Sequence, residues 1–461
     1  MNGVLISALK KSSGKTTISV GVAAALRARG LKVQSFKKGP DYIDPMWLGL
    51  AGGEPCRNLD FHTMPPADIA AFYRDYSAGA DMSLVEGNKG LFDGVDLMGS
   101  DSNAALAKLL GVPVVLVIDT RGMTRGIAPV VQGYTNFYPG VRIEGVILNQ
   151  VGGLRHESKL RAALKHYTDV PVIGAVGRHP KMEIGERHLG LVPANEADEA
   201  TAIIERTRIV VEDNVDIDDL GVIACMADEP TEDCVARLAP PKPDLRIAVA
   251  RDSAFGFYYP DDLEAMQHAG AEIVPFDTLR DAQLPPCDGV FIGGGFPETQ
   301  AGALAANTLL RVDIHQALSA GLPTYAECGG LMYLSKSLSW KGERFKMVGA
   351  IPGDSVMHRT PVGRGYVRLE ATDLSPWPKG DGQSGDVAAH EFHYASLENL
   401  PANSDFAFRV RRGYGIDGHH DGLIVGNTVA TFSHHRNIGG NDWVGQFLGF
   451  VRQIRAERRF A

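Results

Sequence analysis

The sequence predicts an α/β fold in two domains, and three observations support this prediction. The chain has 461 residues, more than a single hydrophobic core usually supports. Short apolar runs alternate with helical patterns, first between residues 4 and 176 and again from residue 245. The acidic stretch EDNVDIDDL and the proline-rich break RLAPPKPD separate the two series, so we place the boundary near Pro240, with domains 1–240 and 241–461.

In the first half, the apolar runs VLISAL, KVQSF, MSLVEG, VPVVLVIDT, RIEGVILNQV and VPVIGAV predict strands. Between them, TTISVGVAAALRARG and NAALAKLLG have apolar residues at helical spacing. Apolar strands separated by helices predict a parallel sheet covered on both faces. In the second half, LRIAVARD, AEIVPF, GVFIGGG and LPTYAEC predict the strands of another α/β unit.

Composition and charge indicate a soluble protein. Hydrophobic residues make up 44% and charged residues 22% of the chain, both ordinary values. The net charge of -9 argues against nucleic acid or an anionic membrane as the main partner. The five dispersed cysteines are typical of reduced thiols. With no signal-peptide layout and no apolar run long enough to span a bilayer, a cytoplasmic location is expected.

The first predicted strand leads into ALKKSSGKTT, which ends like a phosphate-binding loop. Gly14-Lys15-Thr16 lies between a strand and a helix, as the motif requires, although Leu9 replaces its first glycine. The N–H groups and positive dipole end of a helix N-terminus favour phosphate there. Lys15 is then expected to contact the phosphates and Thr16 to bind Mg²⁺. The alternative is a serine- and glycine-rich turn that only caps the helix.

Two further stretches favour a nucleotide site. Glu86 ends the predicted strand MSLVEG, at the edge where open α/β sheets bind ligands, and a carboxylate there suits Mg²⁺. The stretch FKKGPDYIDP places Lys37, Lys38, Asp41 and Asp44 after another strand, with a solvated turn as the alternative. Side chains of these types converging on one sheet edge predict a site for ATP and Mg²⁺.

In the second half, Cys328 follows a predicted strand and precedes a helix-like run in LPTYAECGGLMYL. Such an elbow exposes a nucleophile and directs it at a helix N-terminus, where a thiolate is stabilised. The N–H groups of Gly294 and Gly295 in GVFIGGGFPE, with Gly329, are candidates for an oxyanion hole, although a tight turn also needs glycine. The candidates for the general base are His390, His393, His434 and His435.

The stretches FKKGPDYIDP, CRNLD, EGNKGLFDG and ERHLGL resemble the amidoligase half of the cobyrinic acid a,c-diamide synthase family. That half is similar to dethiobiotin synthetase, whose loop glycine corresponds to Ala8 here and is again absent. The resemblance implies that Mg-ATP phosphorylates a substrate carboxylate and so makes it reactive to ammonia. It implies nucleotide contacts from Ser13, Gly14, Lys15, Thr16, Thr17 and Lys10, the last matching an additional lysine of MinD-like ATPases, and metal ligation by Thr16, Asp41 and Glu86.

The second half resembles the class I glutamine amidotransferase domain of the same family through AVARDSAFGFYYPDDLE, GGGFPE, YAECGGLMYL and HEFHY. The resemblance implies that Cys328 attacks the glutamine amide and that His434 is the catalytic histidine. His435 stays open as the base, because two adjacent histidines replace the related His-x-His pattern. Arg436 stands where many class I enzymes have the glutamate of the triad, so the third member is open too.

Together the two halves imply amidation of the a and c acetate carboxylates of a sirohydrochlorin-derived tetrapyrrole, with ATP and glutamine as co-substrates. Sirohaem and nickel sirohydrochlorin are alternative macrocycles, because EGNKGLFDG and SHHRN depart from the usual corrinoid pattern. Another alternative is an ATP-dependent switch protein with an inactive amidotransferase-like module. The expected partners are small molecules, neither nucleic acid nor membrane, and a homodimer is left open. The expected substrate contacts are Lys37, Asp44, Arg57 and Arg187.

Overall fold

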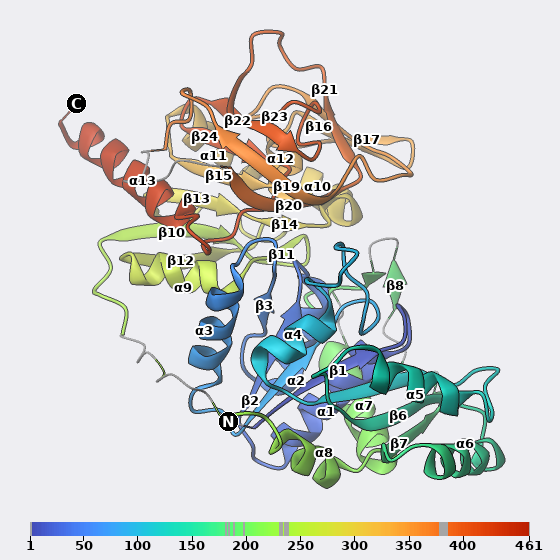
Figure 1. Ribbon diagram of the computed structural model, residues 1–461. Helices are drawn as coiled ribbons and strands as arrows, with labels where there is room; N and C mark the ends of the chain where they lie inside the picture. Colours follow the sequence, from blue (N-terminus) through green and yellow to red (C-terminus); the bar gives the residue numbers. More distant parts are fainter. Residues whose placement is uncertain are drawn as a thin grey trace. The chain divides into compact units, whose positions relative to one another are not determined.

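The computed structural model describes residues 2–179, 182, 185–187, 190–196, 199–229, 234, 239–377 and 386–460. The chain divides into two compact units, Met1–Arg237 and Leu238–Ala461, each with its own large sheet (Figure 1). Among the described residues, no helix is both long and apolar enough to cross a membrane.

The first unit is built on a seven-stranded sheet in the order β3-β2-β4-β1-β5-β6-β7. All neighbouring strands run parallel, which confirms the parallel sheet predicted from the apolar runs. The strands are β1 (Gly3–Ala8), β2 (Val33–Lys38), β3 (Arg57–Leu59), β4 (Met82–Glu86), β5 (Val114–Asp119), β6 (Ile143–Val151) and β7 (Val172–Gly177). A short hairpin, β8 (Glu186–Arg187) and β9 (Gly190–Leu191), lies apart from this sheet.

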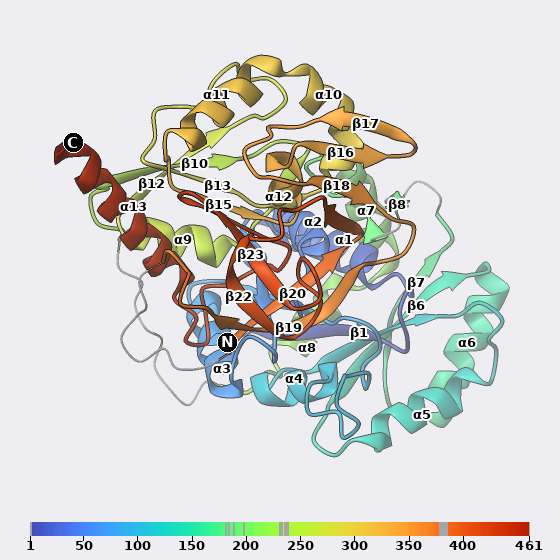
Figure 2. The ribbon, with the colours of Figure 1, turned by 90° about the horizontal axis from the view of Figure 1, so that it is seen from above.

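Helices cover this sheet because parallel strands need long crossovers. The helices are α1 (Lys15–Ala28), α2 (Ile43–Gly52), α3 (Pro66–Ser77), α4 (Asn103–Leu110), α5 (Ile127–Phe137), α6 (Leu154–Tyr167), α7 (Ala200–Asn214) and α8 (Ile217–Ala224). Helix α1 packs against α2 and α7, while α5 packs against α6 beside β6 and β7 (Figures 1 and 2). The strand order shows that the chain reverses direction along the sheet after β3. Right-handed crossovers then place α3 to α6 on the face opposite α1 and α2, whereas α7 returns to pack on α1.

The second unit contains a nine-stranded mixed sheet in the order β12-β10-β13-β15-β24-β23-β22-β19-β20. The strands from β12 to β24 are parallel, and those from β24 to β20 are antiparallel. Its strands are β10 (Leu245–Ala250), β12 (Ala271–Phe276), β13 (Gly289–Ile292), β15 (Thr324–Glu327), β19 (Gly363–Ala371), β20 (Val387–His393), β22 (Asp405–Arg412), β23 (His420–Val425) and β24 (Thr428–Thr431). The predicted strands of the second half all lie in the parallel part.

Smaller elements complete the second unit. Strands β11 (Phe255–Phe257) and β14 (Gly294–Gly295) form a pair, and a four-stranded sheet contains β16 (Ser337–Trp340), β17 (Glu343–Lys346), β18 (Asp354–Met357) and β21 (Ala395–Glu398). The helices are α9 (Pro260–His268), α10 (Ala301–Ala306), α11 (Thr308–Ser319), α12 (Gly329–Leu334) and α13 (Trp443–Phe460), with a 3-10 turn, η2 (Pro297–Gln300).

The core of the second unit lies on both faces of its large sheet. Alternate residues of β10 point to opposite sides, so Ala248 packs with α11 and α12, whereas Ile247 packs with α9 and α13. Burying a large apolar side chain contributes roughly 1.5–3 kcal/mol. Packing on both faces therefore holds the central strands in place. The loops at the carboxyl ends of these strands are attached to a rigid part of the unit.

Candidate active sites

The loop between β1 and α1 requires a glycine at Gly14. Its φ is 85°, and a Cβ there would lie 2.2 Å from Nδ2 of Asn149. The same Nδ2 donates a hydrogen bond to the carbonyl of Ser13 at 2.9 Å, and Oγ of Ser13 donates to the carbonyl of Lys10 at 2.9 Å. These bonds hold the loop closed at the start of α1. Sequence reasoning missed Asn149, the polar residue near the end of β6.

No glycine is required where the standard loop has its first one. Neither Ala8 nor Leu9 has a positive φ, so an ordinary L-residue fits the backbone at both positions. The carbonyl of Leu9 accepts a hydrogen bond from the hydroxyl of Tyr134 at 3.0 Å. The departure from the standard motif is thus accommodated without strain at those residues.

Lys15 is held inside the loop with its ammonium near the acidic end of β4. The side chain is buried, and Nζ donates to the carbonyl of Lys89 at 2.6 Å. Burial lowers the pKa of Lys15 to about 8, and nearby Glu86 acts in the opposite direction. Elsewhere in the loop, Lys10 is exposed and Thr17, in α1, is half-buried.

Five of the predicted residues form one cluster at the carboxyl edge of the first sheet. Oγ1 of Thr16 donates to Oε1 of Glu86 at 2.8 Å and to Oδ2 of Asp44 at 3.2 Å. Nζ of Lys37 donates to the same two oxygens, at 2.6 Å and 2.5 Å, and lies 3.8 Å from Oδ2 of Asp41. Lys37 and Asp44, expected as substrate contacts, thus lie among the expected metal ligands.

The protonation of this cluster is set by burial and by Lys37. Burial raises the pKa of Glu86. Burial, and then repulsion by Asp44, raise the pKa of Asp41 to about 7. Although burial opposes it, the ammonium of Lys37 lowers the pKa of Asp44. Burial acts to lower the pKa of Lys37, but the carboxylates of Asp44 and Glu86 raise it well above its usual value. The lysine thus stays charged and at least one acid ionised.

The cluster fits a magnesium ion that is held together with a phosphate. Among the described residues, no three His, Cys, Asp or Glu side chains are spaced to hold a metal by themselves. Mg²⁺ usually takes one or two protein carboxylates and completes its coordination with phosphate oxygens and water. Oε2 of Glu86 is buried without a hydrogen-bond donor in the described part of the chain, so it has the capacity for such a contact.

The two arginines predicted to contact substrate belong to β3 and β8. Arg57 is buried in β3, with its guanidinium 4.2 Å from the ring centre of Tyr76. The backbone of Arg187 is in β8, but its side chain lies outside the described residues.

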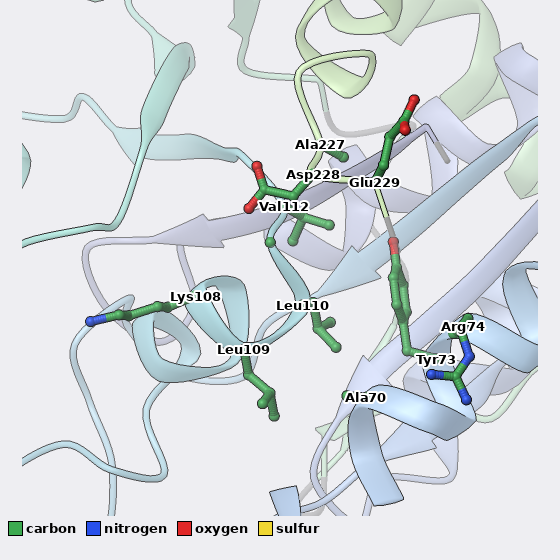
Figure 3. Close-up of a pocket in the computed structure, with 11 residues that line it drawn as sticks. Ala70, Tyr73, Arg74, Lys108, Leu109, Leu110, Val112, Ala227, Asp228 and Glu229 are labelled. Atoms are coloured by element: carbon green, nitrogen blue, oxygen red, sulfur yellow. The ribbon is translucent and has the colours of Figure 1, made fainter. Parts of the chain in front are cut away.

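A cavity of about 240 Å³ opens at the opposite edge of the first sheet (Figure 3). Gly111 and Val112 line it and directly precede β5, which puts it at the amino ends of the strands. Open α/β sheets bind ligands beyond the carboxyl ends of their strands. This cavity is therefore not assigned to the nucleotide.

In the second unit, Cys328 occupies a sharp elbow between β15 and α12. Its φ of 47° and ψ of -98° are unusual for a residue with a side chain. Its N–H donates to the carbonyl of Thr431 at 2.7 Å. A Cβ on Gly330 would lie 2.2 Å from the carbonyl oxygen of Ile292, so the helix can approach the sheet only because this residue is glycine. The strand, elbow and helix lie where the sequence places them.

His434 lies between Cys328 and a carboxylate. Nδ1 of His434 is 3.4 Å from Oε2 of Glu327, the residue that precedes Cys328. Burial acts to lower the pKa of His434, but hydrogen bonds with Cys328 and Glu327 raise it to about 10. A histidine in this state is an imidazolium at neutral pH, which stabilises a neighbouring thiolate. The backbone of His434 pairs with that of His390, and the two rings stack with centres 5.0 Å apart.

The neighbouring His435 has a different environment. Its ring lies 5.0 Å from the ring of Phe408 and 6.1 Å from that of Tyr325. Neither ring nitrogen has a hydrogen-bond partner among the described residues, and burial lowers the pKa of His435 to about 4. His435 is therefore neutral and packed in the core. Of the two histidines that the sequence leaves open, the geometry favours His434 as the partner of Cys328.

The other two candidate bases do not compete. His390 stacks on His434, with its Nδ1 3.4 Å from the hydroxyl of Tyr259. His393 stacks on Phe432 at 4.1 Å and its Nδ1 bonds to the carbonyl of Ala395. Both imidazoles are thus engaged in packing.

The glycines predicted for the oxyanion hole gather around the nucleophile. A Cβ on Gly294 would lie 2.6 Å from Cε1 of His434, and one on Gly329 would lie 3.0 Å from the backbone nitrogen of Gly295. Gly329 directly follows Cys328 in the chain. A side chain on Gly294 would thus meet the imidazole of His434, and one on Gly329 would meet the backbone of Gly295.

Arg436 and Glu327 settle where a carboxylate lies in this site. Arg436, in the expected triad position, is buried and pairs through Nε with Oδ2 of Asp261 at 3.0 Å. The carboxylate that lies against His434 is instead that of Glu327, which directly precedes the nucleophile in the chain. Sequence reasoning missed Glu327 because it looked for the carboxylate after the histidine.

Both halves of the chain match known families. Residues 4–192 match the CobQ/CobB/MinD/ParA nucleotide binding domain, and residues 246–440 match the CobB/CobQ-like glutamine amidotransferase domain. A cobyrinate a,c-diamide synthase of Magnetococcus marinus is 44% identical over 457 residues, which cover 98% of this chain and 97% of that protein. Enzymes of the same name are 41% identical in Methanosarcina acetivorans, over 99% of this chain and 96% of the relative, and 38% identical in a Synechocystis species, over 94% and 89%.

Proposed function

The chain belongs to the cobyrinate a,c-diamide synthase family of glutamine-dependent amidating ligases, and from this premise we propose that it amidates the a and c acetate carboxylates of cobyrinate. The second unit would hydrolyse glutamine, and the first would activate the acid with ATP. The observation that carries the proposal is the presence, in one chain, of a buried cysteine–histidine pair and a phosphate loop beside an acidic cluster.

The glutaminase step uses the pair formed by Cys328 and His434. The thiolate of Cys328 attacks the amide carbon of glutamine, and the N–H groups near Gly295 and Gly329 stabilise the oxyanion. The C–N bond then breaks as the His434 imidazolium gives its proton to the departing nitrogen, which leaves as ammonia. Water, deprotonated by neutral His434, cleaves the thioester and releases glutamate.

The ligase step first activates the substrate carboxylate, because a carboxylate does not react with ammonia. Oxygen of the substrate carboxylate attacks the terminal phosphorus of ATP, so ADP leaves and an acyl phosphate forms. Ammonia then attacks the acyl carbon, and inorganic phosphate departs as the amide forms. The chain's own part is to neutralise the charge that spreads over the phosphoryl oxygens, through Lys15 and Lys37, and to hold the nucleotide by the N–H groups at Gly14.

A magnesium ion would supply further neutralisation of the phosphates in this step. Thr16 and Glu86 are the residues best placed to hold it, with Asp41 or Asp44 beside them. Lys37 donates to Asp44 and Glu86, so its ammonium lies beside the acids that would hold the metal.

Mass spectrometry tests the proposed substrate. Reactions would contain ATP, Mg²⁺, glutamine and, separately, cobyrinic acid, hydrogenobyrinic acid, nickel sirohydrochlorin or sirohaem. Each amidation replaces O–H by N–H₂ and lowers the mass by about one unit. The proposal predicts two such losses with cobyrinic acid. A shift with sirohaem or nickel sirohydrochlorin alone would reassign the macrocycle, and ATP turnover without any shift would favour the switch protein.

A further inference from the structure

Glu327 is anchored so that one carboxylate oxygen faces His434. Its side chain, buried at the end of β15, is 3% exposed. Oε1 accepts a hydrogen bond from the hydroxyl of Tyr325 at 2.7 Å and another from the backbone N–H of His435 at 2.9 Å. Oε2 lies 3.4 Å from Nδ1 of His434. The two bonds to Oε1 fix the carboxylate plane and leave Oε2 for the imidazole.

We propose that Glu327 is the third member of the glutaminase triad, a positioning residue that holds His434 by Nδ1 and thereby presents its other nitrogen to Cys328. The proposal rests on the glutamine hydrolysis proposed above. In serine-type triads the carboxylate fixes the imidazole tautomer and stabilises its charged form without being protonated itself. Here the carboxylate precedes the nucleophile instead of following the histidine, and triads are recognised by geometry and not by chain order.

The surroundings of His434 single out this carboxylate. Cys328 and Glu327 face the ring from the β15–α12 elbow, and the imidazole of His390 stacks on it from β20, backed by the hydroxyl of Tyr259. The ring of His435, the adjacent residue, is neutral. Glu327 is thus the acid placed to balance the imidazolium.

The buried carboxylates Asp261 and Asp262 are engaged elsewhere. Asp261 pairs with Arg436, and Asp262 accepts from the N–H of Asn437 and from Nε1 of Trp443. Both also lie close enough to Arg436 to keep it charged. They therefore offer no equivalent to the Oε2 contact of Glu327.

Glu327→Gln removes the charge while keeping the shape and an acceptor for Tyr325. We expect a fall of about 100-fold in kcat for glutamine hydrolysis, the size of a general acid–base contribution. We expect KM for glutamine to change by no more than about twofold, because the residue does not touch the substrate. The alkaline limb of the pH profile, set by loss of the His434 proton, should move to lower pH. Amidation driven by ammonia should stay at the wild-type rate.

Glu391→Gln is the matched control. Glu391 is also buried, lies 3.5 Å from an imidazole nitrogen of His393, and accepts from the N–H groups of Tyr414 and Gly415 at 2.7 and 2.8 Å. It therefore loses the same charge in a similar setting away from Cys328. We expect its kcat for glutamine and its alkaline limb to match those of the wild type.

Three results would overturn the proposal for Glu327. One is a Glu327→Gln variant with wild-type kcat and an unmoved alkaline limb, and another is an equal loss in Glu391→Gln. If Glu327→Gln fails to fold, as loss of ammonia-driven amidation would reveal, Tyr325→Phe removes one anchor of Oε1 and should lower kcat by about threefold to tenfold. A wild-type kcat in Tyr325→Phe would be the third result that overturns the proposal. Wild-type protein that hydrolyses no glutamine would instead refute the proposed function itself.

Discussion

Lys37 and Glu86 are register partners on the adjacent strands β2 and β4, and Nζ of Lys37 donates to Oε1 of Glu86 at 2.6 Å. The pairing places a cation at the centre of the acids that the nucleotide site needs. It explains how Asp44 and Glu86 can lie together with Thr16 in a buried cluster, because an uncompensated buried carboxylate is costly.

Lys37→Met should therefore destabilise the first unit. Removing one partner of a buried charge cluster leaves the remaining charges uncompensated, and we expect a loss of about 3–5 kcal/mol. Denaturant unfolding, followed by a probe in the first unit, measures it, and added Mg²⁺ should restore more stability to the variant than to the wild type. Lys38→Met is the control, since Lys38 is also buried and donates to the neutral side chain of Asn88 at 3.3 Å. Equal effects of the two substitutions would contradict the assigned role.

Lys15→Ala should abolish amidation while glutamine hydrolysis stays detectable. The substitution removes the ammonium nearest the phosphates, and such contacts are worth several orders of magnitude in phosphoryl transfer. Measuring both activities in the same preparation separates the two steps. Lys11→Ala, an exposed lysine of the same loop, should keep both. Amidation that survives in Lys15→Ala would mean that this loop does not bind ATP.

Cys328→Ala should abolish amidation with glutamine and permit it with a high concentration of ammonia. The thiolate is needed only to release ammonia, so an external supply bypasses it. Product formation with each nitrogen source is the measurement. Cys287→Ala serves as the control, because that thiol is half-buried with a pKa raised to about 11 by burial. Unchanged use of glutamine by the Cys328 variant would show that the nucleophile is another residue.

Gly294→Ala should impair the glutaminase alone. The added methyl would lie 2.6 Å from Cε1 of His434, so the ring must move away from Cys328, and we expect a fall of about 100-fold in kcat for glutamine. Gly302→Ala is the matched control, since its methyl would meet nothing closer than 3.9 Å. If Gly294→Ala hydrolysed glutamine normally, the proposed arrangement of thiol, imidazole and glycines would be incorrect.

Amidation supplied with ammonia should weaken as the pH falls through about 7. The raised pKa of Asp41, about 7, means that its carboxyl takes up a proton well above the pH at which a free aspartate does, and a protonated carboxyl is a poor ligand for Mg²⁺. The metal competes with protons, so raising Mg²⁺ should move the acidic limb to lower pH. The assay compares rates at low and high Mg²⁺ across this range, with total ammonia adjusted to keep free NH₃ constant. If the acidic limb stayed at the same pH when Mg²⁺ was raised, the assignment of Asp41 as a metal ligand would be contradicted.

Strand ends were the most informative part of the sequence. Glu86 was predicted to be functional because it ends a predicted strand at the edge where open α/β sheets bind ligands, and a carboxylate there suits Mg²⁺. In the structure it lies in the cluster with Thr16 and Lys37. The same rule applies to Glu327 at the end of TYAE, but the sequence was interpreted there only through the adjacent Cys328, and Glu327 was not predicted. Asn149 lies two residues before the end of the apolar strand β6.

Other features could not be read from one sequence. Neighbouring residues of an extended chain point to opposite faces, so His434 and His435 differ completely in environment, but the pattern does not say which ring faces Cys328. Strands β19 and β22 carry many arginines on their exposed sides, and their sparse apolar residues hid the antiparallel half of the sheet. The prediction that Arg57 contacts substrate stays a prediction, and the sequence did not show that its guanidinium would stack on Tyr76.

The central claim is that the glutaminase site and the ligase site of this chain act together. The most direct test is to measure whether the amide nitrogen of the product comes from glutamine. The wild-type protein would be given cobyrinic acid, ATP, Mg²⁺ and glutamine labelled with ¹⁵N at the side-chain amide, in buffer that contains unlabelled ammonium at a low concentration. The account predicts a product in which both new amides carry the label, each heavier by about one mass unit than with unlabelled glutamine. Amides without label, or labelled ammonia released with no amide formed, would contradict it.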